Sequence, residues 1–415
     1  MQRYFRRLGP GLITGAADDD PSGISTYSVT GAAFGYAQLW TALFSFPLMT
    51  AVQMMCARLG MVTGQGLAGV IRQHYPRWVL WCACTLLVVA NTVNIGADLG
   101  GMGKVTEMVT GIPSAFWTPV YALVIASFLI WSSYFVVARI FKWLTLVLFA
   151  YVVAAFLAKP DWAVVIRSTL VPHIEWTGRY WATLVGIFGT TISPYLFFWQ
   201  ASQEVEEERE HGALTVEARR GATDAELHKS GIDVVTGMLF SNLIMYFIIL
   251  TTAATLHEHG KTVIATAQDA AEALRPLAGE GAYWLFSLGL VGAGMLGVPV
   301  LAGSSAYAIA EAAVWPGSLA DRPGIAPRFY SVIAVGLVLG LALDYAGINA
   351  VAMLFWSAVV NGVLAPPLIV IVLLLTSNRL VMGSRRNPLW LRTLGWITVV
   401  VMTVAAVAMF ATWGT

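Results

Sequence analysis

The sequence predicts an all-α integral membrane protein with about eleven transmembrane helices. Of the 415 residues, 58% are hydrophobic and 11% are charged, whereas soluble domains are about 45–50% apolar and about 25% charged. Apolar segments are also long: residues 237–256 contain no Asp, Glu, Lys or Arg over the roughly 20 positions that a helix needs to cross the hydrocarbon. Finally, basic residues gather in alternate connections, which is typical of multi-pass membrane proteins.

Composition also argues against several other classes. The 24 Lys and Arg residues and 23 Asp and Glu residues give a net charge of +1 without a basic patch, so we expect no nucleic-acid partner. Cys56, Cys82 and Cys84 lie in apolar segments and are expected to pack, not to form disulfides or a zinc site. Residues 1–7 lead into an apolar segment without a small-residue cleavage site, so we expect the first helix to be retained. The lipid bilayer is an expected partner, and no obligate protein partner is evident.

The apolar segments, taken in order, define the expected spans by their length. We expect one transport domain over residues 1–415, with two five-helix repeats at 10–158 and 181–376 and an additional helix at 392–413. The expected spans are 10–34, 38–58, 78–103, 114–137, 141–158, 181–201, 231–256, 282–312, 327–344, 347–376 and 392–413.

The distribution of basic residues predicts the topology. Eighteen of the 24 lie at the N-terminus or in every second connection, and six lie on the opposite side. Because Lys and Arg are enriched in cytoplasmic loops, we expect a plasma (inner) membrane protein with a cytoplasmic N-terminus and an external C-terminus. The six residues expected outside are Lys104, Lys159, Arg167, Arg179, Lys261 and Arg275.

Residues 202–230 form the one long, highly charged connection in the sequence. The mixture of acidic and basic residues is typical of a solvated, partly helical linker, which we expect in the cytoplasm. A regulatory role in which its glutamates sense cations is the alternative.

Two of the expected spans are interrupted in the middle. The first breaks at "DDDPSG", where Pro21 lacks a backbone donor and Gly23 tolerates irregular dihedral angles, and the sixth breaks at "GTTISPYL", which contains Pro194. Unwound backbone at membrane depth survives only when it is buried in protein or lines a wet cavity. Both interruptions are therefore expected to point inward.

The two interrupted spans are the first members of the two five-span sets. Because five is odd, the second set must have the opposite orientation in the membrane, as in carriers with inverted repeats and a binding site at the bilayer midplane. Span count and the matching interruptions carry this prediction.

Asp18, Asp19 and Asp20 precede the first interruption. An ionised carboxylate in hydrocarbon costs at least about 2.5–3.5 kcal/mol, so three in a row need compensation. Successive residues of a helix point about 100° apart, and all three cannot aim at one point. Asp20 is the best candidate cation ligand because it adjoins the break, where the backbone carbonyl of Ala17 is released. Asp18 and Asp19 are expected in a second shell or access path; capping of the second half-helix is the alternative.

At these residues the sequence resembles the Nramp family of divalent-metal transporters. That family has Asp-Pro-Gly-Asn in its first helix and Met-Pro-His in its sixth, where this chain has Asp20–Gly23 and Ser193–Tyr195. Residues 301–311 and 357–367 are similar to the family's eighth and tenth helices. The resemblance implies a leucine-transporter-type fold, with a 5+5 inverted repeat and unwound helices 1 and 6. It also implies passage of a divalent cation by alternating access.

Departures from the family pattern indicate a different ion. Ser193 replaces the methionine whose soft sulfur favours manganese and iron, and Gly23 replaces a ligating asparagine. The backbone carbonyl of Thr190 remains a candidate ligand by its position relative to Ser193. Loss of two ligands leaves room for water, and Mg²⁺ usually keeps several waters in its shell. We therefore predict uptake of Mg²⁺, and also Mn²⁺, as in a Nramp-related magnesium transporter branch, with the ion as substrate and no cofactor.

Proton coupling is not expected. The family's proton route uses a histidine, a third-helix carboxylate and ninth-helix arginines; this sequence has Tyr195, Asn91 and Asn94 at the first two places and no basic residue in 331–345. Tyrosine, with an ordinary pKa of about 10, is a poor relay near neutrality. Asp98 remains a possible titrating group. We therefore predict uniport of the divalent ion, driven by the membrane potential and the ion gradient.

Other polar residues are weaker candidates. Asn361 could offer an amide oxygen to the ion or its waters, or could hydrogen-bond between helices. Gln200 and Gln203 could line the inner exit.

Four other functions stay open at this stage. A proton-coupled manganese or iron importer would keep the same fold, and a sodium-coupled amino acid carrier could also use broken helices. Three aspartates beside the site would repel a substrate carboxylate, which argues against the second. An intramembrane aspartyl protease needs carboxylates on facing helices, which adjacent aspartates cannot supply, so we expect no enzyme. A non-transporting scaffold would have little use for intramembrane acids.

Overall fold

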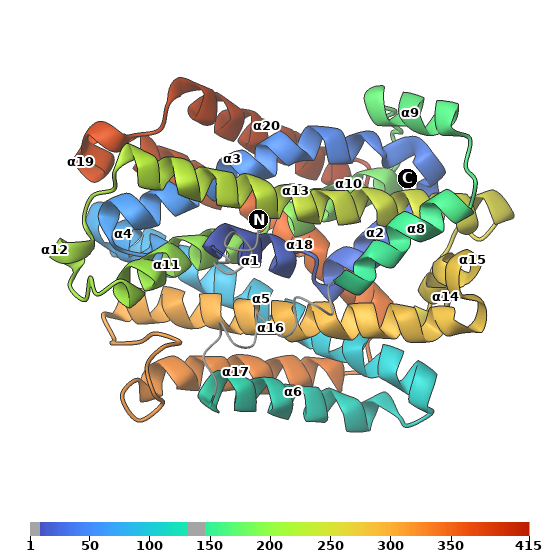
Figure 1. Ribbon diagram of the computed structural model, residues 1–415, viewed down its shortest axis with the longest axis horizontal. Coiled ribbons are helices and arrows are strands. Elements are labelled where there is room, and N and C mark those ends of the chain that lie inside the picture. Colours follow the sequence, from blue (N-terminus) through green and yellow to red (C-terminus); the bar gives the residue numbers. More distant parts are fainter. Residues whose placement is uncertain (1–8, 132–145, 415) are drawn as a thin grey trace.

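A computed structural model describes residues 9–131 and 146–414, and every regular element in these ranges is helical. The long helices run side by side along the longest axis of the molecule (Figure 1). In order, the α-helices are α1 (Pro10–Asp18), α2 (Pro21–Phe34), α3 (Trp40–Thr63), α4 (Leu67–His74), α5 (Arg77–Thr110), α6 (Ser114–Trp131), α8 (Ala150–Leu157), α9 (Trp162–Leu170), α10 (Gly178–Thr191), α11 (Pro194–Glu210), α12 (Val216–Arg219), α13 (Asp224–Thr255), α14 (Ala267–Ala271), α15 (Arg275–Ala278), α16 (Ala282–Ala313), α17 (Pro327–Asp344), α18 (Ala350–Ser377), α19 (Arg379–Met382) and α20 (Leu389–Ala411).

Short 3₁₀ turns complete the connections between these helices. They are η1 (Gly35–Gln38), η2 (Leu146–Phe149), η3 (His257–His259), η4 (Glu272–Leu274), η5 (Gly279–Gly281) and η6 (Gly383–Arg385).

The predicted membrane class is confirmed. Within the described residues, nine helical segments are long and apolar enough to cross a membrane. They correspond to nine of the eleven expected spans. The first expected span is divided between α1 and α2, and only the short apolar helix Val147–Leu157 is described from the fifth. Parts of the expected spans 114–137 and 141–158 lie outside the described residues, as do the basic residues Arg3, Arg6, Arg7, Arg139 and Lys142 that entered the topology prediction.

Both predicted interruptions are confirmed, and a proline restarts each helix. Pro21 is the first residue of α2 after the break at Asp19 and Asp20, and Pro194 is the first residue of α11 after the break at Ile192 and Ser193. Proline suits a first helical position because its missing N–H would have no partner there.

The expectation that Gly23 belongs to the interruption is wrong. Gly23 lies inside the first turn of α2, where a close approach requires a glycine. A Cβ there would lie 2.8 Å from the hydroxyl of Thr190 on α10.

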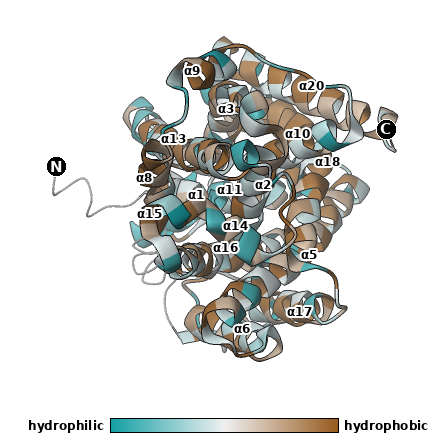
Figure 2. Ribbon diagram, turned by 90° about the vertical axis from the view of Figure 1, so that its right-hand side faces the viewer, coloured by the Kyte–Doolittle hydropathy of each residue, from teal (hydrophilic) through white to brown (hydrophobic). Residues whose placement is uncertain are grey.

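The halves of the first broken helix lie in the middle of the bundle, between α13, α16 and α18 (Figures 1 and 2). Glycines permit this packing. A Cβ at Gly15 of α1 would lie 2.2 Å from the carbonyl oxygen of Gly237 on α13, and one at Gly237 would lie 2.1 Å from the carbonyl oxygen of Gly11. The backbones of α1 and α13 therefore touch directly, as small residues allow in membrane bundles.

An acidic side chain of α13 holds the start of α1. The Gly11 N–H donates to Oδ2 of Asp233 at 2.7 Å. A carboxylate at a helix N-terminus is stabilised by the free N–H groups and the helix dipole.

The outer helices present apolar side chains outward. α20 carries hydrophobic residues on its exposed side (Figure 2), including Val404 and Val407, and α17 exposes Val335 and Val338. In contrast, the most apolar stretch of the α10–α11 pair is entirely buried. The second broken helix is thus an interior element, and α17 and α20 face the lipid.

The charged segment 202–230 differs from the expected solvated linker at its start. α11 continues through it to Glu210, and Ser202, Gln203, Glu204 and Glu206 are buried. Both buried acids have partners: Ser230 donates to Glu204 at 2.9 Å, and Glu206 accepts from Ser318 at 2.6 Å and pairs with Arg209 at 3.2 Å. After Glu210 the chain carries α12 and then a Thr223–Glu226 capping box that starts α13.

Candidate functional site

Asp20 stands at the centre of the candidate site and has two roles. Its Oδ1 accepts the Gly23 N–H at 2.8 Å and the Ser22 hydroxyl at 2.7 Å, so it caps α2. Its Oδ2 faces other helices, where Asn94 of α5 donates at 3.0 Å and Tyr195 of α11 donates at 3.4 Å. Capping, the alternative considered from the sequence, therefore occupies one carboxylate oxygen and leaves the other toward the second break.

Tyr195 joins the two broken helices. It is the second residue of α11, and its hydroxyl lies 3.2 Å from the backbone carbonyl oxygen of Ala17 as well as near Asp20. Ala17 is completely buried next to the end of α1, where the helical ladder stops. A carboxylate oxygen, a released carbonyl oxygen, a phenol hydroxyl and an amide thus meet at one place.

Two glycines of α16 make room for this group of atoms. A Cβ at Gly297 would lie 2.9 Å from Cβ of Asp20, and one at Gly294 would lie 3.2 Å from Pro21. Sequence reasoning missed both, because nothing in the local pattern separates them from the other glycines among the 39 of the chain.

The side chain of Ser193, expected as a ligand, contacts the end of α10 at the second break. Its hydroxyl lies 2.7 Å from the Gly189 carbonyl oxygen and 2.8 Å from the Thr190 carbonyl oxygen. These two carbonyl oxygens have no helical partner at the end of α10, and the single proton of the Ser193 hydroxyl is donated to one or the other. The Thr190 carbonyl, also expected as a ligand, is therefore engaged in this structure. In contrast, the Thr190 hydroxyl is buried beside Gly23.

Asp18 and Asp19 contact α13, which does not contribute to the hydrogen bonds of Asp20. Ser241 of α13 lies 2.5 Å from Oδ2 of Asp18 and 3.2 Å from Oδ1 of Asp19. Both side chains are completely buried, and Asp18 Oδ1 and Asp19 Oδ2 have no hydrogen-bond partner among the described residues. One hydroxyl cannot satisfy two buried carboxylates, whose desolvation is costly. Sequence reasoning missed Ser241, because it is a single serine within an apolar run.

Asp98 also belongs to this region. It is completely buried on α5, one turn from Asn94, and lies close to Asp20 and to the backbone N–H of Ser22. Further along α5, Met102 packs its sulfur against Gly294, next to Pro21. A thioether thus lies beside the first break, which sequence reasoning did not anticipate.

The other sequence candidates lie outside the hydrogen-bonded group at Asp20. Gln200 accepts from Thr14 of α1 at 2.5 Å and donates to Glu204 at 2.9 Å, so it ties α11 to α1. Gln203 is buried in the same part of α11. Asn361 of α18 is buried, and its Oδ1 has no hydrogen-bond partner in the part of the chain that the structure describes.

Asp18, Asp19, Asp20 and Asp98 do not converge on one point. Within residues 9–131 and 146–414, no three His, Cys, Asp or Glu side chains are arranged to hold a metal ion. An ion at Asp20 would thus have one carboxylate and several neutral oxygen atoms around it.

Comparison with known proteins identifies the family of the chain. Residues 11–412 match the family described as natural resistance-associated macrophage protein-like (Nramp). A divalent metal cation transporter MntH of Klebsiella pneumoniae (strain 342) is 26% identical over 95% of this chain and 91% of its own length. The MntH of Bacillus subtilis (strain 168) is 28% identical over 95% of this chain and 89% of its own length.

Solved structures show the same fold. A manganese transporter from Eremococcus coleocola superposes with a TM-score of 0.71 at 18% identity, over 96% of this chain and 85% of that one. The nucleobase-cation-symport-1 family transporter MHP1 superposes with a TM-score of 0.58 at 14% identity, over 98% of this chain and 93% of that one.

Together the fold and the paired breaks define a multi-pass membrane protein with the leucine-transporter-type fold. Within that class, the family match over residues 11–412 identifies the family. The chain belongs to the Nramp family.

Proposed function

We propose that this chain carries divalent metal ions across the membrane, with Mg²⁺ as its main substrate and Mn²⁺ as a second one. Relatives named as divalent metal cation transporters support the general activity. The oxygen-rich group around Asp20, where both helix breaks meet, is the observation that carries the proposal. Alternating access would expose this group to each side of the membrane in turn.

The proposed selectivity for Mg²⁺ rests on the chemistry of the surrounding atoms. Asp20 supplies one carboxylate oxygen, Ala17 a carbonyl oxygen and Tyr195 a hydroxyl. Oxygen ligands suit hard cations, and Mg²⁺ retains several waters where protein ligands are few. Ser193 Oγ and the Thr190 carbonyl oxygen each keep a lone pair while they are hydrogen-bonded to each other, so either would join the ion by turning that lone pair toward it.

We propose that three buried aspartates and two buried asparagines line the path of the hydrated ion. They are Asp18, Asp19, Asp98, Asn94 and Asn361. The three aspartates are buried without basic side chains in the same hydrogen-bonded groups, so a passing dication would favour their ionised forms, and the two asparagines would offer amide oxygens. Gln200 and Gln203 would lie toward the exit along α11.

We propose transport without proton coupling. Tyr195, at the position after the α11 proline, has one hydroxyl proton to donate, and Asn91 and Asn94 place amides on α5 where a titrating group would serve a relay. Movement of a dication down a potential of 100 mV releases about 4.6 kcal/mol, twice the value of about 2.3 for one charge. Uptake through the plasma membrane, with a cytoplasmic N-terminus, would use this gradient.

Met102 and Asp98 favour the alternative, a proton-coupled manganese or iron importer. The Met102 sulfur lies beside the first break and could serve a soft ion, and Asp98 could carry a proton.

Liposome uptake separates the two functions. The purified chain is reconstituted, and Mg²⁺ and Mn²⁺ entry are followed with fluorescent indicators, together with internal pH. We expect Mg²⁺ entry that Mn²⁺ inhibits, without acidification, and unchanged uptake of both ions by Met102→Leu. Mn²⁺ entry that excess Mg²⁺ does not inhibit, accompanied by acidification and lost in Met102→Leu, would establish the alternative.

A further inference from the structure

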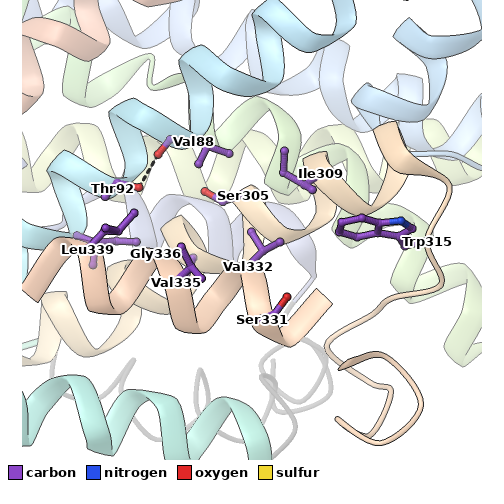
Figure 3. A pocket seen from close by; sticks show the side chains of 12 residues that line it. Val88, Thr92, Ser305, Ile309, Trp315, Ser331, Val332, Val335, Gly336 and Leu339 are labelled. Carbon is purple, nitrogen blue, oxygen red and sulfur yellow. Dashed lines mark hydrogen bonds between the residues drawn. The ribbon is translucent and has the colours of Figure 1, made fainter. Parts of the chain in front are cut away.

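A groove between three of the long apolar helices is lined by none of the residues proposed to bind or guide the ion. It has a volume of about 260 Å³ and lies between α5, α16 and α17, with Trp315 at one end and Leu339 near the other (Figure 3). All three helices are long and apolar enough to cross the bilayer. From Ser331 to Leu339 the groove follows α17 for about 12 Å, at 1.5 Å per residue.

The groove offers few hydrogen bonds to a ligand. Of its three hydroxyls, Thr92 donates to the Val88 carbonyl at 2.7 Å, Ser305 to the Leu301 carbonyl at 3.0 Å and Ser331 to the Arg328 carbonyl at 2.7 Å. Each proton is therefore used within its own helix. The remaining lining is mainly aliphatic, so the groove suits a hydrocarbon chain.

The end of the groove at Trp315 has a different character. Trp315 follows α16 in the connection to α17, and the guanidinium carbon of Arg328 lies 5.4 Å from the centre of its ring. Arg328 is exposed in the first turn of α17. Asp321 in the same connection lies 3.9 Å from Arg209, and Arg328 has no carboxylate partner in the described part of the chain. A tryptophan and an uncompensated arginine thus mark the level of the lipid headgroups.

We propose that this groove binds one anionic phospholipid of the leaflet that Arg328 faces. One acyl chain lies between α5, α16 and α17, and the phosphate contacts Arg328 beside Trp315. Basic residues near a membrane surface attract anionic headgroups, whereas the aliphatic groove accepts an acyl chain of any phospholipid. Arg328 therefore sets the preference among lipid headgroups, and the groove sets the affinity for the acyl chain.

Two pairs of variants test the two parts separately. Gly336 lines the groove, and a Cβ there would approach only Ile95 Cδ1, at 3.8 Å, so Gly336→Phe fills the space. Val338→Phe is its control, because Val338 is 63% exposed on the same helix and does not line the groove. Arg328→Gln removes the headgroup contact, and Arg322→Gln changes an exposed arginine of the same connection.

Native mass spectrometry of the full chain in detergent measures binding of dioleoyl phosphatidylglycerol and dioleoyl phosphatidylcholine. We expect about fivefold tighter binding of the anionic lipid by the wild type, the value of one basic residue near a membrane surface. Arg328→Gln should remove this preference, and Gly336→Phe should remove binding of both lipids at this site. Both controls should match the wild type.

Two results would overturn the proposal: full binding of both lipids by Gly336→Phe, or an unchanged headgroup preference in Arg328→Gln. If Gly336→Phe does not fold, quenching by brominated phosphatidylglycerol gives an independent measurement. The quenched fraction should fall in Trp315→Phe relative to the wild type, and equal quenching in the two proteins would exclude the site.

Discussion

Asp20→Asn separates the two roles of the central carboxylate. Asparagine is as good a helix cap as aspartate, so contacts equivalent to those with the Gly23 N–H and the Ser22 hydroxyl can persist. The variant loses the negative charge that faces Asn94 and Tyr195. Asp20→Ala loses both roles, and its stability should fall by about 0.5–2 kcal/mol from the lost cap alone.

The expected effect on transport is larger than the effect on stability. With their charge centres about 4 Å apart, a carboxylate and a dication attract each other by roughly 8 kcal/mol at an effective dielectric constant of about 20. If desolvation offsets two-thirds of this attraction, about 2.7 kcal/mol remains, which corresponds to about a hundredfold in affinity.

Mg²⁺ flux into liposomes, measured over a range of concentrations, provides the assay. Asp20→Asn and Asp20→Ala should both show at least a hundredfold lower flux at low Mg²⁺, whereas only Asp20→Ala should unfold at a clearly lower temperature. Wild-type flux in a folded Asp20→Asn protein would refute the assignment of this carboxylate to the ion.

Three further predictions concern neighbouring positions. Ser193→Met should raise the ratio of Mn²⁺ to Mg²⁺ uptake, because a thioether would enter the second break; an unchanged ratio in a competition assay would mean that sulfur does not set selectivity there. Gly15→Val should lower the free energy of unfolding by several kcal/mol or prevent folding, since its Cβ would lie 2.2 Å from a backbone oxygen of α13; a normal melting temperature would contradict that contact. Ser241→Ala should cost about 1–3 kcal/mol of stability by leaving the Asp18 carboxylate without its buried partner. Ser241→Thr, which keeps a hydroxyl, should melt near the wild type, and equal losses in the two variants would exclude the hydrogen bond as the cause.

The sequence predicts the membrane class and both helix interruptions because each has a local cause. Pro21 and Pro194 cannot continue a helix, and the apolar segments have the length of a bilayer. Asp20 could also be selected as the central acid, because it adjoins the first break.

The arrangement around Asp20 depends on tertiary contacts and could not be predicted. Asp18 and Asp19 are oriented by contacts with Ser241, which lies more than 200 residues later in the chain. The packing of α5, α10 and α16 determines two further contacts. It lets Ser193 hydrogen-bond to the end of α10, and it places Met102 beside the first break.

The direct backbone contact between α1 and α13 has a mechanical consequence. Where Gly11, Gly15 and Gly237 meet, no side chains interlock, and the Asp233 carboxylate holds the start of α1 through the Gly11 amide. A hydrogen bond to a charged group contributes about 1.5–3 kcal/mol. If the first half-helix tilts about the break at Asp19 and Asp20, it slides along a glycine surface without interlocked side chains, but it must exchange the hydrogen bonds that Gly11 makes to Asp233, Thr14 to Gln200 and Asp18 to Ser241.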